Sequence, residues 1–312
     1  MAGSGLDLGR TGVRFAVAEA GRGGARLTRY LSTDVEPGET PGDAAAATLA
    51  TAARKHGRVR VGLGGSDLML RYLPVPQVED WRLTRLMEFE TREIASRSGA
   101  ELASSYNLIP VPKELDEDDT MLLGLVREDL LEAQAEKLAP IAVESFSPNA
   151  IALYNAWLAL GDHQPKTTLL AHFGAGALDL ALVRGTDLYF ARSLTTPLEK
   201  RDSTLASRLG VDALRARGLI HKHLDLRVTL GEHLGADADR VTRPVLPLYE
   251  GLPTLLSGAV TLCKAQARLR ELALERVLLT GGGALARGLP EMLADRLRVP
   301  VEIWNPAAEM DA

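Results

Sequence analysis

Two short stretches decide the fold of this chain: GLDLGRTGVRFAVAE at residues 5–19 and LAHFGAGALDLALVR at residues 170–184. Each alternates apolar and polar side chains around a glycine-containing turn, a pattern typical of two antiparallel strands joined by a tight turn. They align at a constant offset of 165 residues, which pairs Gly9 with Gly174, Phe15 with Leu180 and Val17 with Leu182. Glycine hairpins are common, so coincidence stays open, but the offset predicts two lobes built on one plan.

The overall composition fits two globular lobes in a reducing compartment. The chain has 312 residues, 46% of them hydrophobic and 25% charged, with a formal net charge of −5. At roughly 100–200 residues per domain this length suggests two lobes, and the composition excludes wholesale disorder. The negative charge gives no support for nucleic-acid binding. The single cysteine, Cys263, allows no disulfide within one chain.

Neither export nor membrane insertion is expected from the sequence. The N-terminus, MAGSGLDLGR, lacks the basic and apolar regions of a signal peptide. The most apolar stretch, residues 150–160, contains Asn155 and is only about two-thirds of a membrane span. We therefore expect a cytoplasmic protein whose membrane role, if it has one, comes through a partner.

Strands and helices alternate along the rest of the chain. Strands are predicted over residues 58–62, 68–73, 105–111, 121–126, 276–280 and 299–303. Helices are predicted over residues 42–57, 77–98, 128–138, 202–209, 212–221, 255–275 and 288–297, and residues 112–119 form an acidic loop. We expect Asp43 to cap the first helix, and Ser147 and Pro148 to begin another that runs to Gly161, with Ile151, Tyr154 and Leu158 on one face. This alternation favours an α/β fold with mixed sheets.

The first hairpin carries residues suited to phosphate and Mg²⁺. Asp7 ends the first strand, and the turn is formed by Gly9, Arg10, Thr11 and Gly12. A carboxylate at this place can orient Mg²⁺-bound water, and the turn amides and the threonine hydroxyl can hold phosphate oxygens. The alternative is that Asp7 only caps the turn. We predict these residues as nucleotide ligands, with Asp7 as the metal ligand.

The second hairpin lacks the matching polar groups. Its turn is formed by Gly174, Ala175 and Gly176. His172 stands where the first hairpin has Asp7, and imidazole is a poor ligand for hard Mg²⁺. Leu178 follows the turn, so no hydroxyl is present. We expect the turn amides to approach a nucleotide, but no catalytic residue is predicted here.

A glycine loop follows an apolar strand late in the chain. It consists of Gly281, Gly282 and Gly283 and precedes a helix. Bare backbone N–H groups at such a place can approach a phosphate or the edge of an adenosine. We include the loop and the nearby Arg287 in the predicted nucleotide site.

The three elements resemble, in their order, the actin-like ATPase superfamily. GLDLGRT at 5–11 and FGAG at 173–176 resemble its two phosphate hairpins, and LLTGGGA at 278–284 its adenosine loop. SPNAIA at 147–152 resembles the helix that connects its lobes. Within the superfamily, LPVPQVEDWRLTRLMEFE at 73–90 and GLPEMLADRLRVPVEIWNP at 288–306 resemble the PilM family of type IV pilus assembly proteins.

The resemblance implies a two-lobed actin-like fold, in which duplicated mixed-sheet subdomains are flanked by helices. The first lobe would cover residues 1–165 and contain a small inserted α+β subdomain at about 60–127. The second lobe would cover residues 166–312, with a smaller subdomain at about 197–254.

The resemblance also implies a function. Such a protein is a cytoplasmic scaffold, peripheral to the inner membrane, in the assembly platform of a type IV pilus or a related secretion system. It binds the cytoplasmic N-terminal peptide of a PilN-like membrane protein, and a homo-oligomer stays open. ATP and Mg²⁺ are the implied cofactors, but His172 and Leu178 replace the Asp and Thr of the family's second hairpin, and residues 209–222 contain no Glu-x-x-Lys pair. We therefore expect a degenerate nucleotide cleft with weak or absent ATP hydrolysis.

Two other functions on the same fold stay open. One is an active ATPase or an ATP-dependent small-molecule kinase, which needs a carboxylate base at the acceptor hydroxyl. No acid after Asp7 stands at a motif position, since Asp179 and Asp187 lie beyond the second turn. The other is an actin-like membrane-tethering protein, whose terminal amphipathic helix is not supplied by NPAAEMDA at 305–312.

Overall fold

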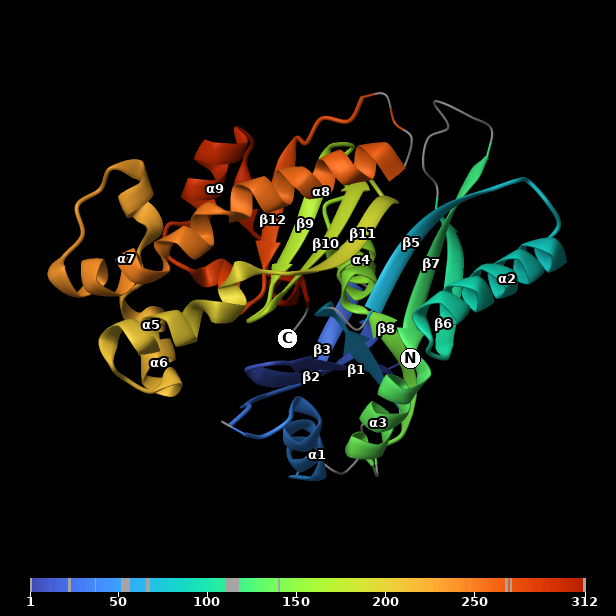
Figure 1. Ribbon diagram of the computed structural model, residues 1–312, viewed down its shortest axis with the longest axis horizontal. Coiled ribbons are helices and arrows are strands. Elements are labelled where there is room, and N and C mark those ends of the chain that lie inside the picture. The colour runs from blue at the N-terminus through green and yellow to red at the C-terminus, as the bar shows by residue number, and fades with distance from the viewer. Residues whose placement is uncertain are drawn as a thin grey trace.

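The computed structural model describes residues 2–21, 24–36, 38–51, 57–65, 68–109, 118–139, 141–266, 269 and 271–310. Their helices and strands form two large sheets, a small third sheet and the helices that cover them (Figure 1).

The first sheet has five strands in the order β3-β2-β1-β4-β8. They are β1 (Ala2–Gly9), β2 (Gly12–Gly21), β3 (Gly24–Asp34), β4 (Val59–Leu63) and β8 (Val143–Pro148). The β1-β2 and β2-β3 pairs are antiparallel, whereas β1-β4 and β4-β8 are parallel. Helices α1 (Pro41–Thr51) and α3 (Glu128–Leu138) cover one face, and Phe15, Leu49 and Leu138 are buried there. The sheet is therefore mixed, as predicted.

The second sheet repeats this arrangement. Its order is β11-β10-β9-β12-β13, with β9 (Thr167–Phe173), β10 (Ala177–Arg184), β11 (Asp187–Thr195), β12 (Arg276–Thr280) and β13 (Val301–Ile303). Again the first two pairings are antiparallel and the last two parallel. The hairpin registers also agree, since Leu8 faces Val13 in one and Phe173 faces Leu178 in the other. Adding 165 to the residue numbers of the β1-β2 pairs gives the β9-β10 pairs, and the two sheets have the same strand order and directions, so the predicted duplication is confirmed.

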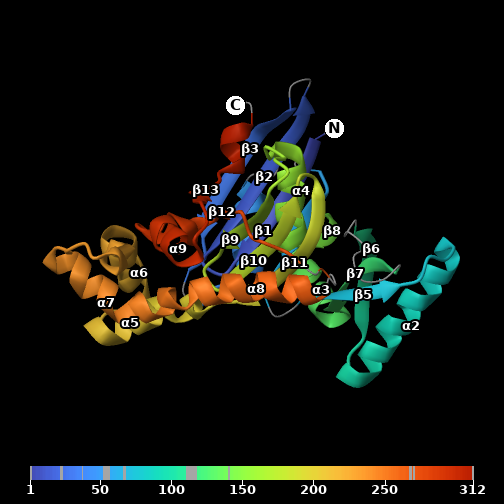
Figure 2. The same cartoon turned by 90° about the horizontal axis from the view of Figure 1, so that it is seen from above.

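Helices surround the second sheet. α4 (Asn149–Leu160) leads into it, and α8 (Leu252–Gln266) and α9 (Leu289–Leu297) pack on it (Figure 2). Farther out lie α5 (Arg201–Leu209), α6 (Ala213–His223) and α7 (Ala236–Glu250). Short 3₁₀ helices complete this lobe: η2 (Pro197–Lys200), η3 (Leu226–Leu230), η4 (Gly282–Leu285) and η5 (Pro306–Glu309).

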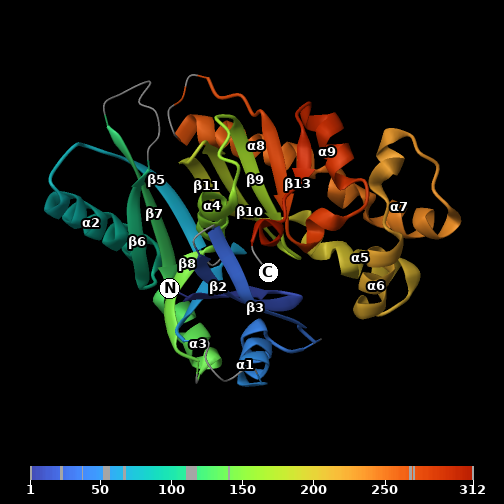
Figure 3. The same cartoon turned by 180° about the vertical axis from the view of Figure 1, so that it is seen from behind.

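A small three-stranded sheet lies at the opposite end from α5–α7 (Figure 3). Its antiparallel order is β5-β7-β6, formed by β5 (Leu68–Val75), β7 (Asp119–Arg127) and β6 (Leu102–Ile109). Helix α2 (Asp80–Ser98) covers one face with its buried residues Leu83, Met87 and Ile94. The helical spacing in residues 77–98 therefore marks the buried face of α2. We call this unit the insert.

Tyr72 of β5 anchors the insert to the second lobe. Its ring stacks on Phe190 of β11, with the ring centroids 5.2 Å apart. Its hydroxyl donates to the carbonyl oxygen of Ala191 at 2.6 Å and accepts the amide hydrogen of the same residue. Because β11 is an edge strand, these two bonds satisfy backbone groups that no neighbouring strand reaches.

Several predicted boundaries were wrong. Asp43 lies inside α1, where Thr40 is the cap: its hydroxyl oxygen accepts the Asp43 amide hydrogen at 3.3 Å. Ser147 and Pro148 belong to β8, because β4 pairs with them, and α4 begins at Asn149. The buried residues of α4 are Ala150, Leu153 and Trp157, rather than the predicted face.

Other elements were not predicted at all, or only in part. Strands β3, β8 and β11 and helix α7 have no counterpart in the prediction, and the helix expected over 255–275 is α8, which ends at Gln266. The acidic loop at 112–119 lies outside the described residues except for its last two positions.

One described helical stretch, Ala236–Gln266, is long and apolar enough by length and composition to cross a membrane. The sequence had suggested a shorter segment, residues 150–160, as the most apolar. The stretch is divided at Gly251 into α7 and α8, and its buried side chains, among them Val245, Tyr249, Leu256 and Cys263, belong to the core of the second lobe. In the most apolar window of this stretch 28% of the residues are buried.

Candidate functional site

The two hairpin turns face each other across the lobes. The guanidinium Nη1 of Arg10, in the first turn, lies 2.6 Å from Glu199 Oε1 in η2 of the second lobe. The same side chain passes the second turn, since a Cβ placed on Gly176 would lie 3.5 Å from Arg10 Nη1. The fold therefore brings together two turns that are 165 residues apart in the sequence.

Each hairpin carries one pair of an acidic and a basic side chain at equivalent positions. In the first, Arg14 Nη1 lies 3.5 Å from Asp7 Oδ2; in the second, His172 Nδ1 lies 3.4 Å from Asp179 Oδ2. Both are cross-strand partners. With the offset of 165, Asp7 corresponds to His172 and Arg14 to Asp179. The order of acid and base is thus reversed between the lobes.

Groups from both hairpins affect the pKa of Asp7. Burial raises the pKa of the Asp7 carboxyl above its ordinary value, and the negative charge of Asp179 acts in the same direction. His172 and Arg14 oppose this shift. Groups from both lobes therefore set the charge of one carboxylate, which places Asp7 at the junction of the hairpins.

Asp179 is the functional candidate that the sequence analysis dismissed. It is 1% exposed, accepts a hydrogen bond from the Ser193 hydroxyl of β11, and faces His172 through its other oxygen. The sequence analysis predicted no catalytic residue in this hairpin, and the structure adds a buried carboxylate beside His172. The offset of 165 could have found the residue, because it aligns Asp179 with Arg14, the strand partner of Asp7.

Asn149, at the start of α4, was not predicted as a site residue and lies beside Gly62 and Gly64. A Cβ on Gly62 would lie 2.2 Å from Asn149 Oδ1. A Cβ on Gly64 would lie 2.7 Å from Asn149 Nδ2 and 3.3 Å from Asp179 Oδ1. Glycine at both positions therefore leaves room for the amide beside the buried carboxylate.

The glycine loop closes the site from the second lobe. Gly281 has a φ of +87°, and a Cβ there would lie 2.6 Å from the Phe173 carbonyl oxygen and 2.8 Å from His172 Nε2. Gly282 approaches the first lobe, since Arg14 Nη2 would lie 3.9 Å from its Cβ. The loop thus reaches both charged pairs.

Most of the predicted site residues lie together at the hairpins, but Arg287 does not. The structure brings together Asp7, the two turns and the glycine loop, whereas Arg287 pairs with Asp225, next to η3, at 3.4 Å. On α6, Arg217 pairs with Asp202 of α5 at 2.9 Å. Burial opposes the charge of the Asp202 carboxyl, but the guanidinium groups of Arg201 and Arg217 lower its pKa below the ordinary value.

The donor set at the hairpins does not fit Mg²⁺. This ion prefers six oxygen ligands in octahedral geometry and keeps most of its water. Here Asp7 is paired with Arg14, Asp179 is occupied by Ser193 and His172, and His172 offers nitrogen. Within the described part of the chain, no group of three His, Cys, Asp or Glu side chains could hold a metal ion.

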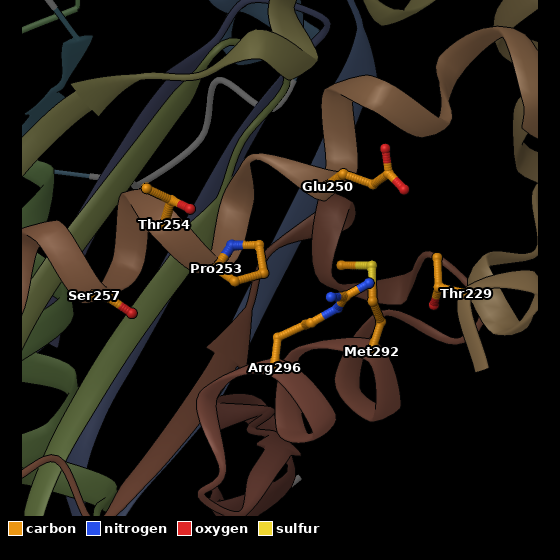
Figure 4. A pocket seen from close by; sticks show the side chains of 7 residues that line it. All are labelled: Thr229, Glu250, Pro253, Thr254, Ser257, Met292 and Arg296. Atoms are coloured by element: carbon orange, nitrogen blue, oxygen red, sulfur yellow. The ribbon is translucent and has the colours of Figure 1, made fainter.

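A pocket of about 460 Å³ lies elsewhere in the second lobe (Figure 4). It is lined by residues of η3, α7, α8 and α9: Thr229, Glu250, Pro253, Thr254, Ser257, Met292 and Arg296. None of these belongs to a hairpin or to the glycine loop, so this pocket is separate from the charged pairs.

Comparisons with known proteins identify the fold. No protein-family model matches the chain, and no curated protein matches it. Among solved structures it is similar to a "PilM-PilN type IV pilus biogenesis complex", with 21% identity over 99% of this chain and 89% of that one and a TM-score of 0.78.

Two more distant structures belong to the same fold. MreB5 of Spiroplasma citri, bound to AMPPNP, is 15% identical over 99% of this chain and 94% of its own, with a TM-score of 0.52. The ethanolamine utilization protein EutJ of Carboxydothermus hydrogenoformans is 12% identical over 99% and 87%, with a TM-score of 0.54. A third structure, a Bacteroides thetaiotaomicron protein with an actin-like ATPase fold, is 11% identical over 98% of this chain and 91% of its own, with a TM-score of 0.52. The chain thus has the actin-like ATPase fold.

Proposed function

We propose that this chain is an actin-fold adaptor of a type IV pilus or a related secretion platform, located in the cytoplasm and held at the inner membrane by a PilN-like protein. The observation that carries the proposal is the similarity to the PilM–PilN complex over 99% of the chain at a TM-score of 0.78. The other actin-fold structures named above reach 0.54 or less.

The insert supports a docking role because it exposes apolar side chains. Among the residues that the structure describes, eleven large hydrophobic residues are exposed, and five of them lie in the insert: Met69, Trp81, Phe89, Tyr106 and Leu108. Aromatic residues on a surface are typical of protein interfaces.

Strand β6 offers a place for an extended peptide. It is an edge of the three-stranded sheet, and no strand of the described residues pairs with its outer side. Tyr106 and Leu108 project from the same face of β6, and Tyr106 donates its hydroxyl hydrogen to Thr84 of α2 at 2.9 Å. A cytoplasmic N-terminal peptide could add as a further strand while its side chains contact this face.

The nucleotide cleft, in this proposal, binds without turnover. The carboxylates that would act as base or hold Mg²⁺ are already paired, since Asp179 is 1% exposed and bonded to Ser193 and His172. A kinase needs a carboxylate that reaches the acceptor hydroxyl, and this arrangement does not favour one.

Fluorescence anisotropy with the labelled cytoplasmic N-terminal peptide of the PilN-like protein tests the proposal. We expect saturable binding by the full chain and none with a scrambled peptide. Tyr106→Lys and Leu108→Lys should each weaken binding about tenfold or more, because each places a charge on the face of β6 that the peptide contacts. Ile303→Lys is the matched control, since Ile303 is 50% exposed on β13 of the second lobe. Absent peptide binding, or steady ATP hydrolysis well above background, would contradict the proposal.

A further inference from the structure

The pocket of about 460 Å³ shown in Figure 4 carries opposite charges on two of its walls. We propose that it binds a small zwitterion, a free amino acid or a dipeptide with an apolar side chain, whose carboxylate contacts Arg296 and whose ammonium contacts Glu250. Because the pocket is separate from the insert and from the hairpins, the inference goes beyond the adaptor function and does not depend on it.

The two charged side chains of the pocket are without partners. Glu250 is the last residue of α7, and Arg296 lies in the last turn of α9. Neither side chain forms an ion pair or a hydrogen bond with any residue that the structure describes. By contrast, Arg298, two positions farther along, is paired with Asp295 at 3.1 Å. Two unpaired opposite charges on one pocket suit a ligand that carries the complementary charge at each end.

The ends of two helices add partial charges of both signs beside the pocket. Helix α7 ends at Glu250 and α8 begins at Leu252, so the negative end of one helix dipole and the positive end of the next meet at Gly251. Pro253 and Thr254, in the first turn of α8, line the pocket. The junction therefore favours a ligand with both an anionic and a cationic group over one with a single charge.

The remaining walls suit a small ligand with an apolar side chain. Met292 is 2% exposed and, together with Pro253, offers an apolar contact surface. Thr254 and Ser257 are exposed residues of α8, and their hydroxyls can hydrogen-bond to polar atoms of a ligand. The volume lies within the range of about 300–1,000 Å³ that is typical of small-molecule sites. A nucleotide fits less well, because it would bring several negative charges to a pocket that contains Glu250.

Isothermal titration calorimetry of the full chain tests the inference, with L-leucine and the dipeptide leucyl-leucine in separate titrations. We expect saturable binding of at least one of them, and the one that binds more tightly identifies the ligand as an amino acid or a dipeptide. The amide of that probe lacks the carboxylate, and its N-acetyl derivative lacks the ammonium. Each derivative should therefore bind at least tenfold more weakly than the probe itself.

Arg296→Gln and Glu250→Gln should each weaken binding tenfold or more, because each removes one of the two charges. Their matched controls are Arg208→Gln, in the last turn of α5, and Glu132→Gln on α3, since both residues are exposed and lie outside the pocket. The controls should bind like the unchanged chain. Hydrogen exchange gives an independent readout, because saturating probe should slow the exchange of amides in residues 251–255 at the α7–α8 junction.

Three results would overturn the inference: no saturable binding of either probe, equally tight binding of the amide or the N-acetyl derivative, or unchanged binding by both Arg296→Gln and Glu250→Gln. Peptide anisotropy on the same preparation separates the two proposals. If the PilN-like peptide binds and neither leucine probe does, the adaptor function stands and this inference fails. If a leucine probe binds and the peptide does not, only the adaptor function fails.

Discussion

Arg10 and Glu199 are joined by an ion pair of 2.6 Å, although 189 positions separate them in the sequence. One belongs to the turn of the first hairpin and the other to η2 of the second lobe. Both side chains are about half exposed, at 58% and 46%. Solvent therefore screens the pair, and its effect is on the relative position of the turns more than on the stability of the fold.

Glu199→Gln should loosen the junction of the hairpins without unfolding the protein. We expect amide hydrogen exchange at Gly174–Gly176 to become faster and the free energy of unfolding to fall by about 1 kcal/mol or less, as for other exposed pairs. The readouts are exchange mass spectrometry and denaturant unfolding. Glu144→Gln removes a similarly exposed pair with Arg60, within the first sheet, and should leave those amides unchanged. Equal exchange in the two variants would refute the role of Arg10 and Glu199.

Tyr72→Phe should destabilise the protein measurably. The variant keeps the stacking on Phe190 but leaves the N–H and C=O of Ala191 without their partner, which costs about 1–3 kcal/mol in a buried setting. Tyr106→Phe, which removes an exposed bond to Thr84, should cost about 0.5 kcal/mol. Urea unfolding measures both. If the two variants lose the same stability, the hydroxyl of Tyr72 is not an anchor of the insert.

The thiol of Cys263 should not react with thiol reagents in the folded chain. It is completely buried, and burial raises the pKa of its thiol to about 12, so the reactive thiolate is almost absent at pH 8. We expect no reaction with a thiol reagent until denaturant is added, and then one thiol per chain. Rapid labelling of the native protein at pH 8 would show that α8 opens frequently.

Asp162→Asn should cost stability at neutral pH but not in acid. Arg276, only 10% exposed, holds Asp162 through two hydrogen bonds of 2.7 and 2.5 Å, and this contact lowers the pKa of the carboxyl. The stabilisation is therefore present above the unfolded-state pKa of about 3.9 and is lost as the pH falls through the lower folded-state value. We expect a difference of about 1–2 kcal/mol at pH 7, allowing for the partial exposure of Asp162. The difference should shrink below about pH 4 in unfolding titrations. A constant difference across this range would contradict the assignment.

Much of the fold could be read from local patterns. The period-two alternation around Gly9 and Gly174 predicted both hairpins, and the offset of 165 predicted their equivalence, because an identical side-chain pattern imposes an identical register. The helix predicted over residues 77–98 is α2, whose buried residues Leu83, Met87 and Ile94 recur at helical spacing. Strand β3 was missed because most of its residues are polar or exposed and do not alternate strongly. Strand β11 was missed because residues 188–191 form a continuous buried run rather than an alternating pattern.

In the candidate site, too, some features could be predicted from the sequence and others depend on the tertiary structure. The sequence alone determined that two glycine turns and a glycine loop exist and that His172 replaces an acid, since these are properties of single positions. Only the tertiary structure decided that Asp179 is buried against Ser193, that Asn149 fills the space left by Gly62 and Gly64, and that Arg10 reaches Glu199. The reason is physical: a pairing between distant residues depends on how the two sheets pack, and desolvation depends on what surrounds a group, so neither is encoded in any one segment.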